Sequence, residues 1–493
     1  MPQIDFVVVL MLENRSFDHL FGFHPGVNGL KGDEFNLLHP DSPESTSNPR
    51  FTVGQNAPFA IAKGEGPSHS LKATNVQLSG VADGPGAGHP VKLDGFVLSY
   101  SNGFFGAHIQ PTNAMLEDVM QVFTPDRLPA LNALADEFVL CDNWFAEVPG
   151  PTQPNRLYTH CASSQGFAFN DFSRTIDVDT IYNRLEAGGK NWAVYFSDDN
   201  DVAKFDRVIA KAYTEAAEEA DFESDRAAGH PGAFLDFKTF FQQHCASGKL
   251  SSFNFIEPAF GDSTTTKNQV DSMHAPHDVR PGDQLIADVY EALRANEDVW
   301  KRSLLIVTFD EHGGFFDHVA PPPAVNPDGI DEPGVPAKGV PAFAFDRLGL
   351  RVPAILASPF LPKGKVVSRQ YQHTSVITTV REIFGLSAPL TRRDAAAVSF
   401  ADQLTGTFRN DTPAKLAQPA AAPQIGVVEA KTAPVDELML EKAQGWQNIL
   451  SRTTGLQPTR ITTAEQAHEI MRTAVKDYAN WKFERRFGAP PRS

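Results

Sequence analysis

Two apolar runs, far apart in the chain, each lead directly into acidic and amide residues. Residues 6–12 precede Glu13-Asn14, and residues 304–309 precede Asp310-Glu311. A short unbroken run rich in β-branched residues is typical of a strand that is buried on both faces of a parallel sheet. Because ligands bind outside the carboxyl ends of strands in open α/β sheets, we expect both polar clusters to meet at one site.

The polar residues after these runs are of the kind that bind a divalent cation. Three carboxylates and the Asn14 amide, with His312 next along the chain, offer oxygen and nitrogen ligands. Gly313 and Gly314 allow a tight turn that can direct adjacent carboxylates to one ion. The alternative is a solvated strand-to-loop exit with ordinary salt bridges.

Composition limits the classes of partner. The 493 residues include 43 basic and 60 acidic ones, a formal net charge of −17, which disfavours nonspecific binding to nucleic acid or to an anionic membrane surface. The cysteines are too few and scattered for a disulfide framework, so we predict free thiols at Cys141, Cys161 and Cys245.

The sequence also limits the expected location. No run reaches the roughly 20 apolar residues that a membrane helix needs. The first apolar run lacks the basic segment and cleavage site of a signal peptide. As given, the sequence predicts a cytoplasmic protein; a leader removed upstream would make a periplasmic or secreted protein the expectation.

Strand and helix patterns alternate along most of the chain, which predicts an α/β fold with a mostly parallel sheet and helices on both faces. Besides the two apolar runs, we expect strands at 138–140, 192–196, 253–256 and 352–358, and helices at 128–134, 281–296 and 374–384. The loop-rich stretch at about 22–115 is too long for a structureless loop, so it predicts a folded insertion over the active face.

The composition changes near residue 410. We therefore expect a catalytic domain at 1–410, an Ala/Pro-rich linker at 411–433 and a helical C-terminal segment at 434–493.

Residues 150–156, GPTQPNR, form the sharpest local motif. Pro154 suits the first turn of a helix, so Thr152 would lie just before it, where backbone N–H groups favour anions. A hydroxyl there, beside a metal, could attack phosphorus while Asn155 or Arg156 holds the non-bridging oxygens. The alternative is that Thr152 is only an N-cap, the usual role of Thr at such a position.

Several loop residues are candidates for proton transfer. His274 follows the strand expected at 253–256, and His69 lies in the insertion; either could protonate a leaving oxygen or stabilise charge at phosphorus. Asp317 could manage protons on the leaving group and water. Each histidine has a plainer alternative as a hydrogen-bonded loop residue, and His373 can be read as the start of a helix.

Three segments resemble the signatures of the bacterial phosphoesterase family that contains phospholipases C and related acid phosphatases: 13–19 (ENRSFDH), 150–156 and 310–319. They occur in the family's order between about residues 4 and 400. The resemblance implies an alkaline-phosphatase-like α/β fold, a three-layer sandwich, with one divalent metal ion whose identity stays open.

By motif matching, the resemblance implies roles for several candidate residues. Thr152 would be the nucleophile, forming a phospho-enzyme that water hydrolyses, with His69 and His274 as further catalytic residues near the phosphoryl group. From the residues themselves we add Asp317 as a catalytic residue and Asn155, Arg156 and His318 as substrate-binding residues. The implied metal ligands are Glu13, Asn14, Thr152, Asp310 and Glu311. Thr in place of Ser, and Asp-Glu in place of Asp-Asp, favour the phospholipase C branch.

The leading hypothesis is therefore metal-dependent hydrolysis of phosphate esters, with phospholipid among the candidate substrates and no nucleic-acid partner. Broad-specificity acid phosphatase activity on monoesters and a non-catalytic phosphate- or metal-binding relic are the alternatives. Sulfatase chemistry is a weaker rival, because no cysteine lies in a sulfatase-like context. Oligomeric state is not predicted.

Overall fold

The two apolar runs form neighbouring strands. β1 (Phe6–Leu12) pairs in parallel with β9 (Ser303–Phe309), and Leu12 lies opposite Phe309. On its other side, β1 pairs in parallel with β8 (Phe253–Glu257). The carboxyl ends of these three strands therefore meet at one edge of the sheet, as the sequence predicted. The computed structural model describes residues 2–61, 66–86, 88–102, 111–170, 178–197, 232–260, 270–335 and 339–422, together with isolated positions between 440 and 470.

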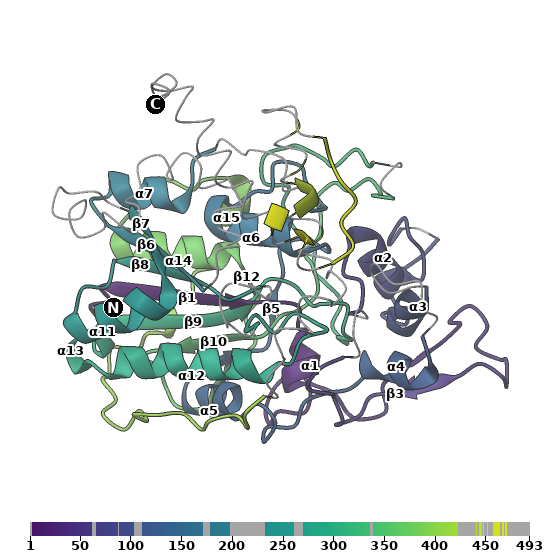
Figure 1. Ribbon diagram of the computed structural model, residues 1–493, viewed down its shortest axis with the longest axis horizontal. Helices are drawn as coiled ribbons and strands as arrows, with labels where there is room; N and C mark the ends of the chain where they lie inside the picture. Colours follow the sequence, from purple (N-terminus) through teal and green to yellow (C-terminus); the bar gives the residue numbers. More distant parts are fainter. Residues whose placement is uncertain are drawn as a thin grey trace.

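Within these residues the central sheet has eight strands, in the order β11-β4-β10-β9-β1-β8-β6-β7 (Figure 1). The remaining strands are β4 (Val139–Cys141), β6 (Trp192–Phe196), β7 (Gly232–Asp236), β10 (Ala354–Ala357) and β11 (Lys365–Val367). β10 is antiparallel to β9 and β4, whereas the other neighbours are parallel. The predicted, mostly parallel sheet is confirmed.

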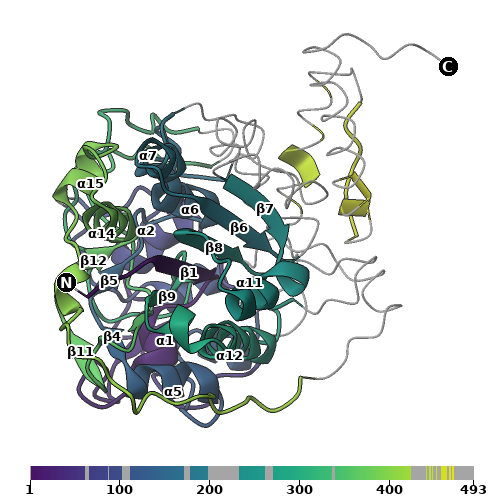
Figure 2. The same ribbon diagram turned by 90° about the vertical axis from the view of Figure 1, so that its left-hand side faces the viewer.

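Helices cover both faces of this sheet (Figures 1 and 2). One layer contains α6 (Thr152–Cys161), α7 (Ile181–Ala187), α14 (Thr374–Phe384) and α15 (Arg392–Ala396). The other contains α5 (Pro129–Glu137), α11 (Gln242–Ser247), α12 (Arg280–Arg294) and α13 (Glu297–Trp300), with a π-helical turn at Phe237–Phe241. A short 3-10 turn spans Ala401–Gln403, and β5 (Trp144–Phe145) pairs with β12 (Tyr371–Gln372). The three-layer α/β sandwich predicted from the sequence is confirmed.

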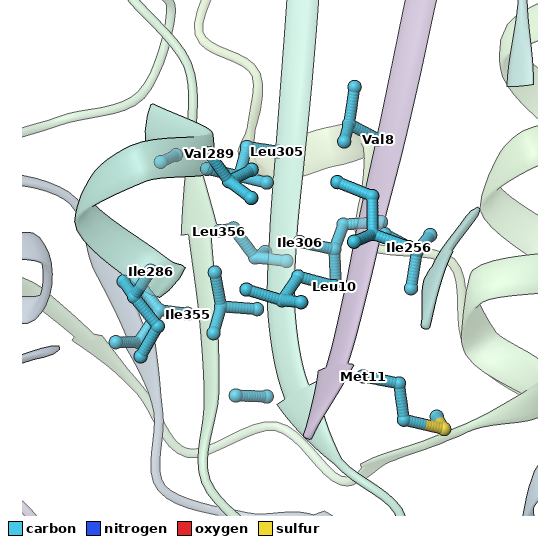
Figure 3. Close-up of a cluster of buried hydrophobic side chains, with 14 of the residues drawn as sticks. Val8, Leu10, Met11, Ile256, Ile286, Val289, Leu305, Ile306, Ile355 and Leu356 are labelled. Carbon is cyan, nitrogen blue, oxygen red and sulfur yellow. The ribbon is translucent and has the colours of Figure 1, made fainter. Parts of the chain in front are cut away.

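Close packing between α12 and the sheet makes the central strands rigid. Every residue of β1 and β9 is buried. Ile286 and Val289 of α12 lie against Leu305 and Ile355 (Figure 3). The apolar residues of α12 recur every three to four positions, which places them on one helix face. Each large aliphatic side chain buried in this way contributes about 1.5–3 kcal/mol, so the strand ends that carry the polar clusters have a stable base.

Element boundaries differ from the sequence expectation where a proline intervenes. The strand expected at 352–358 is shorter, because β10 begins only after Pro353, which has no N–H for the ladder. The elements expected at 192–196 and 374–384 match β6 and α14.

The stretch at about 22–115 is a folded insertion, as predicted. It contains β2 (Phe35–Leu37), β3 (Arg50–Thr52), α2 (Leu71–Ser79), α3 (Phe96–Ser101) and part of the following α4 (Asn113–Asp118). A separate apolar cluster, which includes Phe51, Leu78, Phe96 and Tyr100, holds these elements together. In Figure 1 they lie beyond the carboxyl ends of the strands, next to α1 (Phe17–Phe21).

Only part of the predicted linker and little of the predicted C-terminal helical segment fall within the described residues. The chain after residue 411 lies along α12, because the Tyr290 hydroxyl donates to the Pro413 carbonyl at 2.6 Å and Arg280 donates to that of Ala421 at 3.1 Å. Leu416 is buried against the core. None of the described helices has the length and apolarity needed to cross a membrane.

Candidate active site

Hydrogen bonds join the ends of β1 and β9 directly. The backbone N–H of Asn14 donates to Asp310 Oδ1 at 3.1 Å, and that of Arg15 donates to the Glu311 carbonyl at 3.1 Å. Asn14 adopts a left-handed conformation with φ 59°, which Asn tolerates better than most residues. The turn after β1 is therefore fixed against the acidic pair that follows β9.

Arg156 links three strand ends from α6. Its guanidinium donates to Glu257 Oε2 at 2.7 Å and to Asp310 Oδ2 at 3.3 Å, and lies 3.6 Å from Glu13 Oε1. It also donates to the carbonyls of Met11 and Leu12. This guanidinium is fully buried and engaged by the protein. Arg156 thus holds the ends of β1, β8 and β9 together. Its predicted contact with substrate stays a prediction.

Thr152 is the first residue of α6, and Pro151 is the N-cap. The Thr152 hydroxyl is buried and has no hydrogen-bond partner, so it does not cap the helix. The capping alternative is therefore wrong. Thr152 and Arg156 are four residues apart in a helix, so they share a face, the one turned towards the strand ends.

The other polar groups at the start of α6 are already engaged. The Gln153 N–H donates to Asn170 Oδ1 at 2.8 Å. Asn155 accepts from the Val148 N–H at 3.0 Å and donates to the Gly150 carbonyl at 2.9 Å. Asn155 therefore fixes the backbone of the loop before Thr152 by hydrogen bonds. Its predicted role in substrate binding is not tested, but these bonds give it a structural task.

Two glycines let the third motif approach the first motif and the insertion. Gly313 has φ +67°, and a Cβ there would lie 2.1 Å from the Asn14 carbonyl oxygen. A Cβ on Gly314 would lie 2.7 Å from the Pro67 side chain and 2.8 Å from the Ser68 carbonyl oxygen. Only glycine permits these approaches, which bring the segment before His69 to the strand ends.

His69 lies between Asn14 and Glu311. Its Nδ1–H donates to the Pro67 carbonyl at 3.2 Å, so Nε2 accepts from the Asn14 amide at 3.3 Å. The same nitrogen is 3.9 Å from Glu311 Oε1. Burial lowers the pKa of His69 to about 4, which keeps the ring neutral. The His274 ring meets it edge to face, with 5.7 Å between the ring centroids.

Negative charge dominates this buried region. Burial, together with the neighbouring Asp310 carboxylate, raises the pKa of Glu311 well above its ordinary value. Burial also raises the pKa of Asp310, although Arg156 opposes that shift. Gly313 N–H, which donates to Glu311 Oε2 at 2.8 Å, satisfies only one of the two oxygens. The region would be stabilised by a positive ion.

The donor atoms fit a divalent metal. The side-chain oxygens Asn14 Oδ1, Thr152 Oγ1 and Glu311 Oε1 are buried without a hydrogen-bond partner. Leaving such atoms unbonded is costly, and hard cations bind oxygen ligands of this kind. These three residues were predicted as ligands, together with Glu13 and Asp310, and that ligand set stays a prediction.

Asp317 and His318 belong to a neighbouring network. With Asp18 they place carboxylate and imidazole atoms within 4.8 Å of one another, close enough to share a metal ion. However, Arg351 donates to Asp317 at 2.9 Å and to Asp18 at 2.8 Å, and His318 Nδ1 lies 2.6 Å from Asp18. A buried guanidinium already pairs with both carboxylates of this trio and offsets one of their two charges. Within the described residues, no hydrogen bond joins Asp317 or His318 to Thr152 or Asp310, so their predicted roles in chemistry stay predictions.

Several buried residues that support the site were not predicted from the sequence. Glu257 is the last residue of β8 and Glu13 directly follows β1, so the same strand-end signal could have identified Glu257. His373 begins α14, as expected, and its Nε2 also donates to the Asp310 carbonyl at 2.7 Å, while Trp144 donates to its Nδ1 at 3.2 Å. No local pattern reveals that contact.

Comparison with known proteins agrees with this geometry. The Phosphoesterase family matches residues 4–387, so the chain belongs to that family and is a hydrolase of phosphoester bonds. It is 33% identical to "Non-specific phospholipase C6" of Arabidopsis thaliana over 96% of this chain and 86% of that protein. It is 28% identical to "Hemolytic phospholipase C" of Pseudomonas aeruginosa over 78% of this chain and 53% of that protein. The relatives include plant proteins, so the expectation of a bacterial family was too narrow.

Among solved structures, a phosphonate monoester hydrolase of Agrobacterium radiobacter is 12% identical, with a TM-score of 0.31, over 59% of this chain and 74% of that one. A member of the alkaline phosphatase superfamily from Vibrio parahaemolyticus is 10% identical, with a TM-score of 0.31, over 56% of this chain and 65% of that one.

Proposed function

We propose that this protein is a metal-dependent phosphodiesterase of the phospholipase C type, which cleaves its substrate through a phospho-enzyme on Thr152. One observation carries the proposal: the Thr152 hydroxyl is buried, has no hydrogen-bond partner and lies one helical turn from Arg156, which contacts Asp310. A structural threonine in this position would be expected to cap its helix.

Glu13, Asn14, Thr152, Asp310 and Glu311 would hold the metal. When bound, it would polarise a phosphoryl oxygen and lower the pKa of the Thr152 hydroxyl. The neutral His69 holds the amide nitrogen of Asn14, which leaves the amide oxygen available as a ligand. Arg156 keeps the Asp310 carboxylate in place.

The reaction has two displacements. In the first, Thr152 Oγ1 bonds to phosphorus and the ester P–O bond breaks; His274 gives a proton to the leaving oxygen, and solvent takes the hydroxyl proton. In the second, water attacks phosphorus and gives a proton to His274, while the Thr152 oxygen leaves and regains a proton from solvent. One ester and one water become an alcohol and a phosphate monoester.

One observation favours a diesterase over a monoesterase, and another argues against a non-catalytic relic. The relatives from a plant and from bacteria are named as phospholipases C, which favours cleavage of a diester. A relic would gain nothing from keeping the unbonded Thr152 hydroxyl and the unbonded Glu311 Oε1 in its interior. Phospholipid is the substrate class that follows, and a monoesterase remains the alternative that an assay separates.

The experiment compares wild type with Thr152→Ala on p-nitrophenyl-phosphocholine and p-nitrophenyl phosphate, before and after chelation and metal replacement. We expect metal-restored cleavage of the choline ester and a loss of about 10⁴-fold or more in Thr152→Ala. After chelation, the melting temperature of the variant should fall only by the small cost of the removed methyl group, because the removed hydroxyl makes no hydrogen bond. Acid-quenched wild type should carry a phosphoryl group that Thr152→Ala lacks.

Three results would contradict parts of this proposal. Full activity of Thr152→Ala would remove the nucleophile. Preference for the monoester would indicate a phosphatase, and inactivity on both esters in every metal would favour the relic.

A further inference from the structure

We propose that Arg15 is a positioning residue that holds the His274 loop in register with the metal-binding residues. The inference rests on the proposed function, in which His274 protonates the leaving oxygen. Arg15 Nε and NH2 both donate to the carbonyl oxygen of Met273, at 2.9 and 2.7 Å. Met273 immediately precedes His274, so these two hydrogen bonds fix the backbone next to the proposed proton donor.

The orientation of the Arg15 guanidinium is itself fixed. His19 Nδ1 lies 2.7 Å from the Gln121 carbonyl, which can only accept, so His19 Nε2 is left to accept from Arg15 NH1 at 3.1 Å. The Phe315 ring stacks on His19 at 3.9 Å and lies 4.6 Å from Arg15 Cζ. Three guanidinium nitrogens and one face of the group thus have defined neighbours.

The charge of Arg15 is not explained by an ion pair. Its side chain is buried, and among the described residues no carboxylate forms a salt bridge with it, although Glu311 and Asp278 attract it from farther away. A buried guanidinium without a paired carboxylate is costly, so it is retained only where its donors do something that an apolar side chain cannot. Donating two hydrogen bonds to the single Met273 carbonyl is something that an apolar side chain cannot do.

The gripped loop has a conformation that needs support. Met273 has φ 68°, a left-handed value that is rare for residues other than glycine. A second bond comes from the same motif, because the Glu13 N–H donates to the Ser272 carbonyl at 2.8 Å. Glu13 and Arg15 therefore hold two successive carbonyls of the loop that carries His274.

This arrangement couples acid and metal chemistry. Glu13 and Asn14 are proposed metal ligands, and Arg15 follows them directly. A single turn after β1 would thus position both the bound metal and the proton donor. The leaving group would then be protonated next to the phosphorus that the metal holds. Effects of Arg15 on leaving-group protonation should act through His274. The Arg15 charge also acts on the Glu311 carboxylate, so the variants are compared at saturating metal.

A leaving-group series tests this prediction. The substrates are phosphocholine esters of p-nitrophenol, phenol and a simple alcohol, and the enzymes are metal-loaded wild type, Arg15→Met, His274→Asn and the double variant. An alkoxide needs a proton to leave, whereas p-nitrophenolate does not. We expect Arg15→Met to lower kcat about 10²-fold or more on the alkyl ester and less than about tenfold on the p-nitrophenyl ester. His274→Asn should show the same steepened dependence, and the double variant should be no slower than His274→Asn.

The control is Arg302→Met. Arg302 is a half-exposed arginine near the opposite end of the strands; it pairs with Asp5 at 2.6 Å and should leave all rates unchanged. If Arg15→Met does not fold, Arg15→Lys carries the same comparison, because one ammonium can donate to the Met273 carbonyl but cannot grip it from two nitrogens.

An equal loss on all three esters, or losses that multiply in the double variant, would overturn the positioning role. Failure of the proposed function is recognised separately, because wild type would then be inactive on every ester or Thr152→Ala would be active.

Discussion

At the scale of single residues, the site depends on backbone conformations that few side chains allow. Asn14 has φ 59° and Gly313 has φ +67°, and the two residues touch through the Asn14 carbonyl. The conformations follow from the need to turn two strand ends towards each other within a few residues. Glycine after the second strand was recognisable in the sequence as a turn signal, whereas its contact with Asn14, about 300 positions away, was not.

Comparing Gly313→Ala with a control variant separates two losses of folding free energy: the strain of a left-handed backbone at Ala and the clash of its Cβ with Asn14. The new Cβ would lie 2.1 Å from the Asn14 carbonyl oxygen, so the turn must shift and the metal-binding group with it. Gly339→Ala is the matched control, because Gly339 has the same φ of +67° but no heavy atom within 4 Å of its Cβ position. We expect urea unfolding to show a loss of about 1–2 kcal/mol for Gly339→Ala and a larger one for Gly313→Ala.

Activity and metal affinity should fall only in Gly313→Ala. Equal losses of stability in the two variants, with activity retained, would show that the approach of Gly313 to Asn14 is unimportant.

At the scale of elements, α2 connects the insertion to the metal-binding turn. Gln77 Nε2 donates to the Ser68 carbonyl at 2.9 Å, which fixes the amide so that Oε1 accepts from His312 Nε2 at 2.7 Å. His312 Nδ1 lies 3.4 Å from Glu311 Oε2. The helix therefore orients both the loop that bears His69 and a residue beside Glu311.

Gln77→Met should weaken catalysis without unfolding the protein. It removes both bonds but keeps a side chain of similar length, so His312 and the Ser68 segment lose their common anchor. Loss of an outer partner of this kind typically costs about 10- to 100-fold in metal affinity or activity. The measurement is kcat together with chelator titration of the bound metal. Lys72→Met, an exposed change on the same helix, is the control; equal behaviour of the two variants would refute the connection.

At the scale of the whole molecule, the order β9-β1-β8 in the sheet brings together segments from three distant parts of the chain. The buried carboxylates at these strand ends outnumber the buried guanidiniums that face them, and burial, together with the Asp310 carboxylate, raises the Glu311 pKa. The carboxylates at the ends of β9, β1 and β8 therefore repel one another when they are ionised. A divalent ion would relieve this repulsion.

Chelation should lower the melting temperature of wild type, and added divalent metal should restore it. At a free metal concentration of about 100 times Kd, binding stabilises the folded state by about 2.7 kcal/mol. Glu13→Gln should reduce this metal-dependent shift. Asp317→Asn should keep it, because Asp317 is paired with Arg351 in the separate network, although its overall stability will be lower. Loss of the shift in Asp317→Asn instead would place the metal with Asp18 and His318.

The sequence by itself determined the α/β class, the principal strands, the two polar segments at their ends and the motif at the start of α6, because buried strands, tight turns and helix starts leave strong local patterns. It did not reveal that the Thr152 side chain does not cap its helix, that Arg156 bonds to three strand ends or that Arg351 pairs with both Asp18 and Asp317. Those features depend on which side chains meet across hundreds of residues. Hydrogen bonds and charges act through space, so only the tertiary structure decided which polar residues are bound to each other and which remain available for chemistry.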